Sequence, residues 1–255
     1  MAEYNANNML AIIKRNGEEF NVDLGKPLDI SIPLRDDQQP NCFWAPPFET
    51  SPVKMDGFIG STAEGGFVNF KNVRINPHGN GTHTECVGHI AKDAYSINDC
   101  LQEFWFKAKV ISILPQKIGN GDKVITKSQI EACEIKDCNA LVLRTLPNLK
   151  DKMQMNYSGT NPTYMEPEAA AYLVELGIEH LLIDLPSVDR EEDDAALLAH
   201  RAFWQYPKNI RENCTISELI FVPNTVEDGD YFLNLQIASF TIDVSPSKPV
   251  LYAVL

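Results

Sequence analysis

The stretch Asn76-Pro77-His78-Gly79-Asn80-Gly81-Thr82-His83-Thr84-Glu85-Cys86-Val87-Gly88-His89 carries the clearest chemical pattern in the chain. It holds three of the five histidines, interleaved with one carboxylate and with glycines that let the backbone fold side chains inward. Imidazole and carboxylate are the ligand types that zinc, manganese and iron take. If the stretch is extended, His83 and Glu85 point to one side of it, because side chains alternate along a strand. We therefore expect a metal or catalytic site here.

Strand and helix patterns extend from this stretch in both directions. Two apolar runs, 10–14 and 19–24, flank an Asn16-Gly17 turn signal and predict a hairpin. Period-2 alternation or apolar character predicts further strands at 67–75, 104–114, 140–145, 180–184, 219–222, 231–237 and 250–255. Helices are expected over 126–133, over 166–176, where Pro167 and Gly177 mark the two ends, and from Asp189 to Trp204. Strands that alternate with helices after a β-rich start indicate an α/β or α+β domain. We find no repeat or linker and expect one domain over residues 1–255.

Composition excludes several classes of function. The 255 residues contain 22 Lys+Arg and 35 Asp+Glu, a formal net charge of −13. Such a balance disfavours nucleic acid and anionic membranes as partners, since both need clustered cations. No apolar run approaches the ~20 residues that span a bilayer, and residues 1–8 lack the pattern of a secretory signal. The six cysteines are scattered, which favours a reduced, cytoplasmic protein over a disulfide scaffold.

The histidine-rich stretch also resembles a known family. Gly81-Thr82-His83-Thr84-Glu85 with His89 is similar to His-x-Gly-Thr-His-x-Asp-x-Pro-x-His, the signature of the metal-dependent cyclase family, to which bacterial kynurenine formamidase and isatin hydrolase belong. Further segments resemble that family in the expected order, namely 29–34, 183–189, 217–219 and 246–252. The resemblance spans roughly residues 28 to 255. It implies a swivelling β/β/α fold of class α/β, with a mixed central sheet or barrel-like core flanked by helices.

The resemblance assigns roles to individual residues. His83 and Glu85 would be metal ligands, and His78 would replace the first histidine of the signature. His200 and Glu218 would complete a second metal position, so that one or two divalent ions, Zn²⁺ or Mn²⁺, are expected per chain. His89 falls on the general acid/base. The aromatic pair Phe43 and Trp44 falls near the wall of the substrate pocket.

Three positions depart from the signature. Its first histidine should stand at Gly79, one residue after His78, and we expect a bulge of the glycine-rich backbone to bring His78 to the metal. Glu85 replaces an aspartate, and Val87 replaces a proline. Glu212 competes with Glu218 for the same role, and we prefer Glu218 because residues 215–220 are strand-like.

Four other polar residues have simpler interpretations. His180, just before a predicted strand, is interpreted as structural or surface-exposed, and Asp184 as a member of an ion pair or a turn cap. Ser187 lacks the Gly-x-Ser-x-Gly setting of a serine hydrolase. Cys86 is disfavoured as a nucleophile, because an activated water makes it unnecessary.

These features predict an enzyme that hydrolyses a small carbonyl substrate. A cation held by imidazoles and a carboxylate lowers the pKa of bound water from ~15.7 towards ~7. The expected substrate is an N-formyl arylamine, an amide or a lactone. The alternatives are a ring-opening cyclic amide hydrolase, as in isatin hydrolase, and a non-catalytic relative that binds a metal or small ligand. Analogy with relatives also predicts a homodimer or homotetramer.

Overall fold

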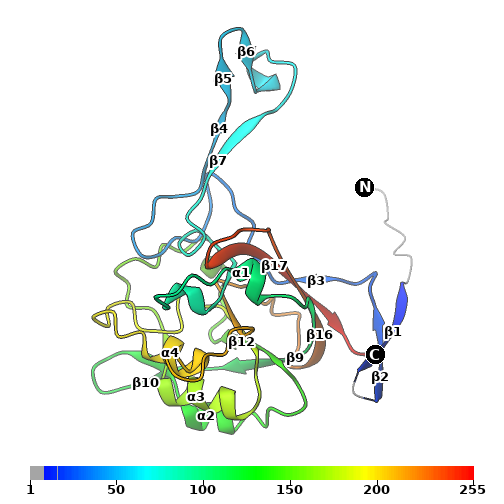
Figure 1. Cartoon of the computed structure of the whole chain (residues 1–255), viewed down its shortest axis with the longest axis vertical. Helices are drawn as coiled ribbons and strands as arrows, with labels where there is room; N and C mark the ends of the chain where they lie inside the picture. Colours follow the sequence, from blue (N-terminus) through cyan, green and yellow to red (C-terminus); the bar gives the residue numbers. More distant parts are fainter. Residues whose placement is uncertain (1–8, 16) are drawn as a thin grey trace.

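A closed, barrel-like ring of strands forms the centre of the molecule (Figure 1). The structure, a computed structural model, describes residues 9–15 and 17–255. In this part of the chain the ring consists, in spatial order, of β16 (Gly229–Ile237), β9 (Trp105–Ile113), β12 (Ala140–Thr145), β14 (His180–Ile183), β15 (Thr215–Glu218), β8 (His83–Glu85) and β17 (Val244–Ala253). It closes because β17 pairs with β16, and β3 (Leu28–Asp29) adds to β17. The mixed sheet confirms the expected α/β fold with a barrel-like core.

The parallel half of the ring separates two hydrophobic clusters. β9, β12, β14 and β15 run parallel, and β12 and β14 are buried along their whole length, as strands covered on both faces are. Side chains alternate between the faces: Leu141 and Leu143 pack with the helices, whereas Ala140 and Val142 pack with β16 and β17 inside the ring.

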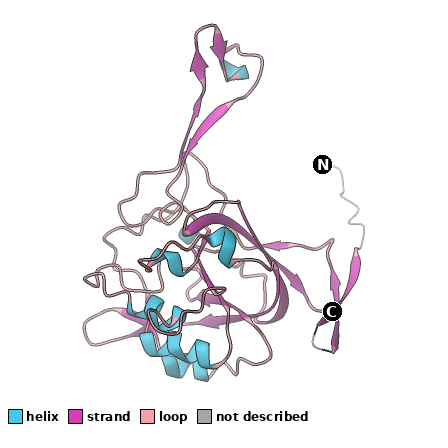
Figure 2. Cartoon of the chain, viewed as in Figure 1, coloured by secondary structure: helices cyan, strands magenta, loops and turns pink. Residues whose placement is uncertain are grey.

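The helices gather on the outer face of the parallel strands (Figure 2). They are α2 (Lys127–Glu131), α3 (Pro167–Glu175) and α4 (Leu198–Trp204), while the short α1 (Ile97–Cys100) packs elsewhere. Thr126 caps α2 through a reciprocal capping box with Gln129. Pro167 occupies the first turn of α3, and Gly177 follows its end with a φ of 78°. The predicted helices at 126–133 and 166–176 are thus confirmed.

Most predicted strands are also confirmed. The N-terminal hairpin consists of β1 (Leu10–Arg15) and β2 (Glu18–Asp23), and Asn16 of its turn lies outside the described residues, as do residues 1–8. A second small sheet contains β10 (Gln116–Lys117), β11 (Lys123–Ile125) and β13 (Tyr164–Met165). The strand predicted at 219–222 is wrong: β15 ends at Glu218, because Leu219 adopts a positive φ of 51°.

The predicted start of the last helix near Asp189 is wrong as well. α4 begins at Leu198, and Asp194, Ala195 and Leu197 before it all have positive φ. Asp189 nevertheless caps this helix from a distance. Its carboxylate accepts the backbone N–H groups of Ala199 and His200 at 2.7 and 3.1 Å. Asp189 therefore caps α4 from the far side of a loop. The acidic residues of that loop are typical of a first helical turn, which is why the sequence predicts a helix there.

A slender β-arm projects from the body of the molecule (Figure 1). It contains β4 (Glu49–Pro52), β5 (Lys54–Met55), β6 (Phe58–Ile59), a 3₁₀ turn (Thr62–Glu64) and β7 (Lys71–Arg74). Only part of the strand predicted at 67–75 forms, since β7 begins at Lys71. Phe67 is 97% exposed, and Val68, Phe70 and Val73 are exposed too. Phe70 packs edge-on against Phe58 of the same arm, with 6.2 Å between the ring centroids, but none of these four side chains is buried in the core.

His180 lies in the core, away from the other histidines. Its Nδ1 is 2.9 Å from Thr215 Oγ1, and its ring packs on Phe106. Burial, together with the charge of Arg211, lowers the pKa of His180 to about 3. The structural interpretation of His180 is therefore confirmed.

A buried neutral histidine makes stability depend on pH. Between pH 6.5 and 3 the unfolded chain binds a proton at His180 that the folded chain does not, so the free energy of unfolding falls by about 1.4 kcal/mol per unit of acidification. We expect His180→Asn to remove roughly 2 kcal/mol of the loss that the wild type shows between pH 7 and pH 5. Urea unfolding at both pH values measures this difference. Parallel pH profiles for the two proteins would contradict it.

Candidate metal centre

Strand β8 places two of the predicted ligands on one face. It lies between β15 and β17, with His83 opposite Glu218 and Glu85 opposite Val244. His83 and Glu85 share a face, and Glu218 joins them from the neighbouring strand. Thr84 points to the other side, where its hydroxyl lies 2.6 Å from that of Ser217. The backbone is extended over His83–Glu85, which is the condition under which the sequence predicts that His83 and Glu85 share a face.

The glycine-rich turn before β8 brings in His78. A Cβ at Gly79 would lie 2.3 Å from the Cβ of Ala45, so this position has no room for a side chain. Asn76 closes the turn by accepting the Gly79 N–H at 3.1 Å. His78 then lies with Nδ1 3.1 Å from Glu85 Oε2. The turn thus brings His78 next to Glu85 despite its one-residue shift from the signature.

Helix α4 supplies His200 from the opposite side. Its Nδ1 lies 2.6 Å from Asp189 Oδ2, and its Nε2 lies 3.0 Å from Glu85 Oε1 and 3.8 Å from Glu218 Oε1. The predicted convergence of His83, Glu85, His200 and Glu218 is therefore present in the structure. Glu212, the rival of Glu218, is exposed, whereas Glu218 is buried and its Oε2 lies 3.3 Å from His83 Nε2.

Three imidazoles are arranged in the same way. One ring nitrogen of each contacts a hydrogen-bond acceptor on the outer side of the group, and the other ring nitrogen faces the centre. The outer partners are the Gly81 carbonyl for His83, at 2.8 Å, Asp189 for His200 and Asp243 for His78. Metal-binding histidines show this arrangement in most proteins, because an outer acceptor fixes the tautomer and the ring orientation.

The centre of the group contains buried polar atoms that lack partners. Among the described residues, His83 Nε2 and Glu85 Oε2 are buried without a hydrogen bond, although Glu218 Oε2 lies 3.3 Å from the former. A buried polar atom without a hydrogen bond costs about 1–3 kcal/mol. A cation between these atoms would satisfy both. Nitrogen and carboxylate donors at this spacing fit a divalent metal ion.

The charges in the centre also favour a cation. Burial lowers the pKa values of His78 and His200, but nearby carboxylates outweigh it and raise both to about 10. Burial conversely raises the pKa of Glu85, and the surrounding imidazoles hold it well below its usual value. The carboxylates thus attract positive charge strongly, and a metal ion competes with protons for the same positions.

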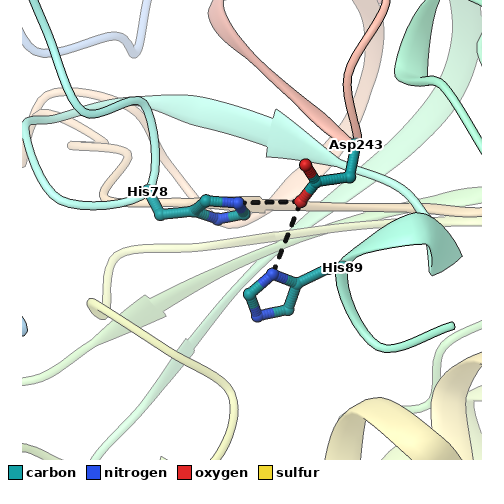
Figure 3. A group of neighbouring side chains, drawn as sticks. All are labelled: His78, His89 and Asp243. Atoms are coloured by element: carbon teal, nitrogen blue, oxygen red, sulfur yellow. Dashed lines mark hydrogen bonds and ion pairs between the residues drawn. The ribbon is translucent and has the colours of Figure 1, made fainter. Parts of the chain in front are cut away.

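His89 lies beside this centre, at the end of the 3₁₀ turn Val87–His89. Its Nδ1 is 3.7 Å from Glu85 Oε2 and 3.6 Å from Asp243 Oδ2. Asp243 Oδ2 also lies 2.9 Å from His78 Nε2, so one carboxylate oxygen faces two imidazoles (Figure 3). Sequence reasoning missed Asp243. No local pattern marks this residue: it reaches the group only because it directly precedes β17, whose residues Val244 and Pro246 pair with β8.

A cavity of about 530 Å³ opens onto the centre. Its described lining comprises Phe43, His78, His89, His200, Glu218, Ser187, Leu197 and residues 189–195. Phe43 has a positive φ of 54° and borders the cavity, as predicted. Trp44 is 65% exposed and is not part of this lining, and its N–H donates to Ser158 Oγ.

The remaining candidates have structural environments. Lys152 donates to Asp184 at 2.7 Å, which confirms the ion-pair interpretation. Ser187 Oγ accepts the Asp189 N–H at 3.1 Å. Cys86 is buried, and its hydrogen bond with Cys100, together with burial, raises the pKa of its thiol. A raised thiol pKa disfavours a nucleophilic role.

The barrel and its buried cluster of imidazoles and carboxylates define a protein with a potential metal site in an open cavity. The family model described as "Putative cyclase" matches residues 23–190, so the chain belongs to this family. The chain is 28% identical over 228 residues to kynurenine formamidase from Bacillus anthracis, covering 89% of this chain and 97% of that protein. With the Bacillus cereus enzyme of the same name it shares 28% identity over 193 residues, 75% and 83% of the two chains.

Solved structures show the same fold. The predicted metal-dependent hydrolase from Bacillus stearothermophilus aligns with a TM-score of 0.63 at 17% identity, over 89% of this chain and 98% of that one. Isatin hydrolase A from Labrenzia aggregata, bound to benzyl benzoate, aligns with a TM-score of 0.65 at 14% identity, over 90% and 94%. These findings confirm the resemblance to the cyclase family.

Proposed function

We propose that this protein is a metal-dependent hydrolase that cleaves the C–N bond of a small formamide, with an N-formyl arylamine as the expected substrate type. The observation that carries the proposal is the convergence of inward-facing imidazole nitrogens with Glu85 and Glu218 at a buried point beside an open cavity. Relatives named kynurenine formamidase and structural neighbours named isatin hydrolase support this class of reaction.

We propose that the protein binds one or two Zn²⁺ or Mn²⁺ ions through two sets of ligands that share Glu85. His78, His83 and Glu85 would hold the first, and Glu85, His200 and Glu218 the second. A divalent cation bound there lowers the pKa of water and polarises a carbonyl oxygen.

The chain's own residues supply orientation and proton transfer. His89 lines the cavity, with Nδ1 facing carboxylates and its second ring nitrogen directed away from Asp243 (Figure 3). An imidazole in this position can give a proton to the leaving nitrogen, which otherwise departs as a poor anion. Phe43 offers an apolar face to a flat ring.

A ring-opening reaction on a cyclic amide is the second candidate. It needs the same activated water and the same proton donor, and the isatin hydrolase neighbours favour it. The cavity wall contributes Glu191, Glu192, Asp193 and Asp194, whereas Arg190 turns to Asp122 at 3.1 Å. A wall with this charge favours neutral or cationic substrates over anions.

The proposal is tested with the metal-loaded protein. N-formylkynurenine, isatin and a simple lactone are each incubated with the protein after dialysis against Zn²⁺ or Mn²⁺, and metal content is measured in parallel. We expect hydrolysis of a formamide that disappears on chelation and returns with metal. Hydrolysis of isatin alone would favour the second candidate. Stoichiometric metal without turnover of any substrate would support a non-catalytic binding protein instead.

We also propose that the protein is a homodimer or homotetramer and that the β-arm contacts a second copy. Phe67, Phe70 and Val73 are large apolar side chains that lie exposed on the arm, and apolar side chains gathered on one surface mark interaction sites. We expect the double substitution Phe67→Asp and Phe70→Asp to shift the mass measured by light scattering to that of one chain. Asp56→Lys on the same arm is the charge control and should leave the mass unchanged. A monomeric wild type would refute the proposal.

A cytoplasmic location is proposed as well. All six cysteines are free thiols, as expected in a reducing compartment. Among the described helices, none has the length and apolar character needed to cross a membrane.

A further inference from the structure

We propose that Asp243 is a positioning residue that orients two imidazoles at once, the metal ligand His78 and the proton donor His89. The inference deepens the proposed function and rests on it. It starts from the geometry of one carboxylate oxygen, Asp243 Oδ2, which lies 2.9 Å from His78 Nε2 and 3.6 Å from His89 Nδ1 (Figure 3).

The contact with His78 fixes which ring nitrogen faces the metal position. Nε2 donates its hydrogen to Asp243, which leaves Nδ1, 3.1 Å from Glu85, as the lone-pair nitrogen directed inward. His78 needs such an anchor more than the other ligands do. It comes from a turn rather than a strand or helix, and its side chain is a quarter exposed, whereas those of His83 and His200 are buried.

The distance between Asp243 Oδ2 and His89 Nδ1 is longer than a hydrogen bond. Asp243 is nevertheless the carboxylate best placed to accept the Nδ1–H of His89. The other carboxylate near His89 Nδ1 belongs to Glu85, whose oxygens also face His78 and His200. Catalytic hydrogen bonds are often long in an enzyme without substrate and shorten in the complex. An Nδ1–H held by Asp243 leaves Nε2 as the atom that exchanges protons with the substrate.

The position of Asp243 follows from the sheet. β17 begins at Val244, which pairs with Glu85, so the residue before the strand lies at the edge of the ligand group. The pairing of β17 with β8 therefore places the Asp243 carboxylate next to His78, which is 165 positions away in the sequence.

Two matched substrates separate the two functions of Asp243. Formanilide has an arylamine leaving group that needs a proton, whereas 4-nitrophenyl formate carries the same formyl group on a leaving group that does not. With saturating Zn²⁺, we expect Asp243→Ala and Asp243→Asn to lower kcat for formanilide by about 10²-fold or more, with much smaller losses for the ester. Asp189→Asn perturbs the anchor of His200 and the cap of α4 but makes no contact with His89, and it should lower both rates by the same factor.

A measurement without turnover tests the contact with His78. Chelator competition with Zn²⁺ should show that Asp243→Ala weakens metal binding by roughly 10- to 100-fold, while the exposed Asp230→Asn control binds as the wild type does. Unchanged affinity would overturn the role toward His78. Equal rate losses on both substrates would overturn the role toward His89. If the wild type hydrolyses neither formyl compound, the proposed function fails, whereas the Zn²⁺ affinities still decide whether Asp243 orients His78.

Discussion

We expect His83→Ala to abolish turnover, with a loss of at least about 10³-fold, because it removes the proposed ligand whose Nε2 faces the centre of the cluster. His83 is fully buried, and its Nε2 points to the position between Glu85 and Glu218 without a hydrogen bond of its own. Electrostatic stabilisation by a metal ion amounts to several kcal/mol, and every 1.36 kcal/mol corresponds to a factor of ten in rate. The steady-state rate and the metal content per chain measure the effect together.

A second buried histidine provides the matched control for this prediction. His180→Asn removes an imidazole that is equally buried but lies on β14 outside the cluster. It should keep its metal and its rate at pH 7. Circular dichroism should show that both variants remain folded. Activity that survives in both His83→Ala and Glu85→Ala would rule out the metal-dependent mechanism.

We expect His89→Gln to lower kcat by about 10²- to 10⁴-fold, the usual range for the loss of a general acid or base, while the protein keeps its metal. His89 borders the cavity, and its side chain is more exposed than those of His83 and His200. Metal analysis decides between its two possible roles, since His89 also lies within reach of Glu85 and His200 as a potential ligand. A variant that loses metal along with activity would identify His89 as a ligand instead.

The local part of the site could be predicted from the sequence, because it depends on short-range geometry. The spacing of His83 and Glu85 needs only an extended backbone to put both on one face, and the structure has that backbone. Buried strands such as 140–145 were predictable for the same reason, since a continuous apolar run is what a covered parallel strand requires. His200 and Glu218 could be placed only through the family resemblance.

Features that depend on contacts distant in sequence were not predictable. The acidic run 191–194 is typical of a helix start, yet Glu191 accepts the N–H groups of Gly159 and Asn161, and Asp193 accepts that of Leu197. These carboxylates therefore stabilise a loop that lines the cavity, and no first helical turn forms there. Asp243 carries no local pattern, and its role emerges only when β17 pairs with β8.

The placement of β8 has a consequence for how folding and activity are linked. This three-residue strand lies at one of the two places in the ring where parallel pairing changes to antiparallel pairing, and it carries two of the five proposed ligands, His83 and Glu85. An ion bound there would hold together the turn that carries His78, the strands β8 and β15, and helix α4. A ligand that binds only the folded chain shifts the unfolding equilibrium towards the folded state by mass action. The concentration of available metal would therefore determine the fraction of folded protein as well as the catalytic rate.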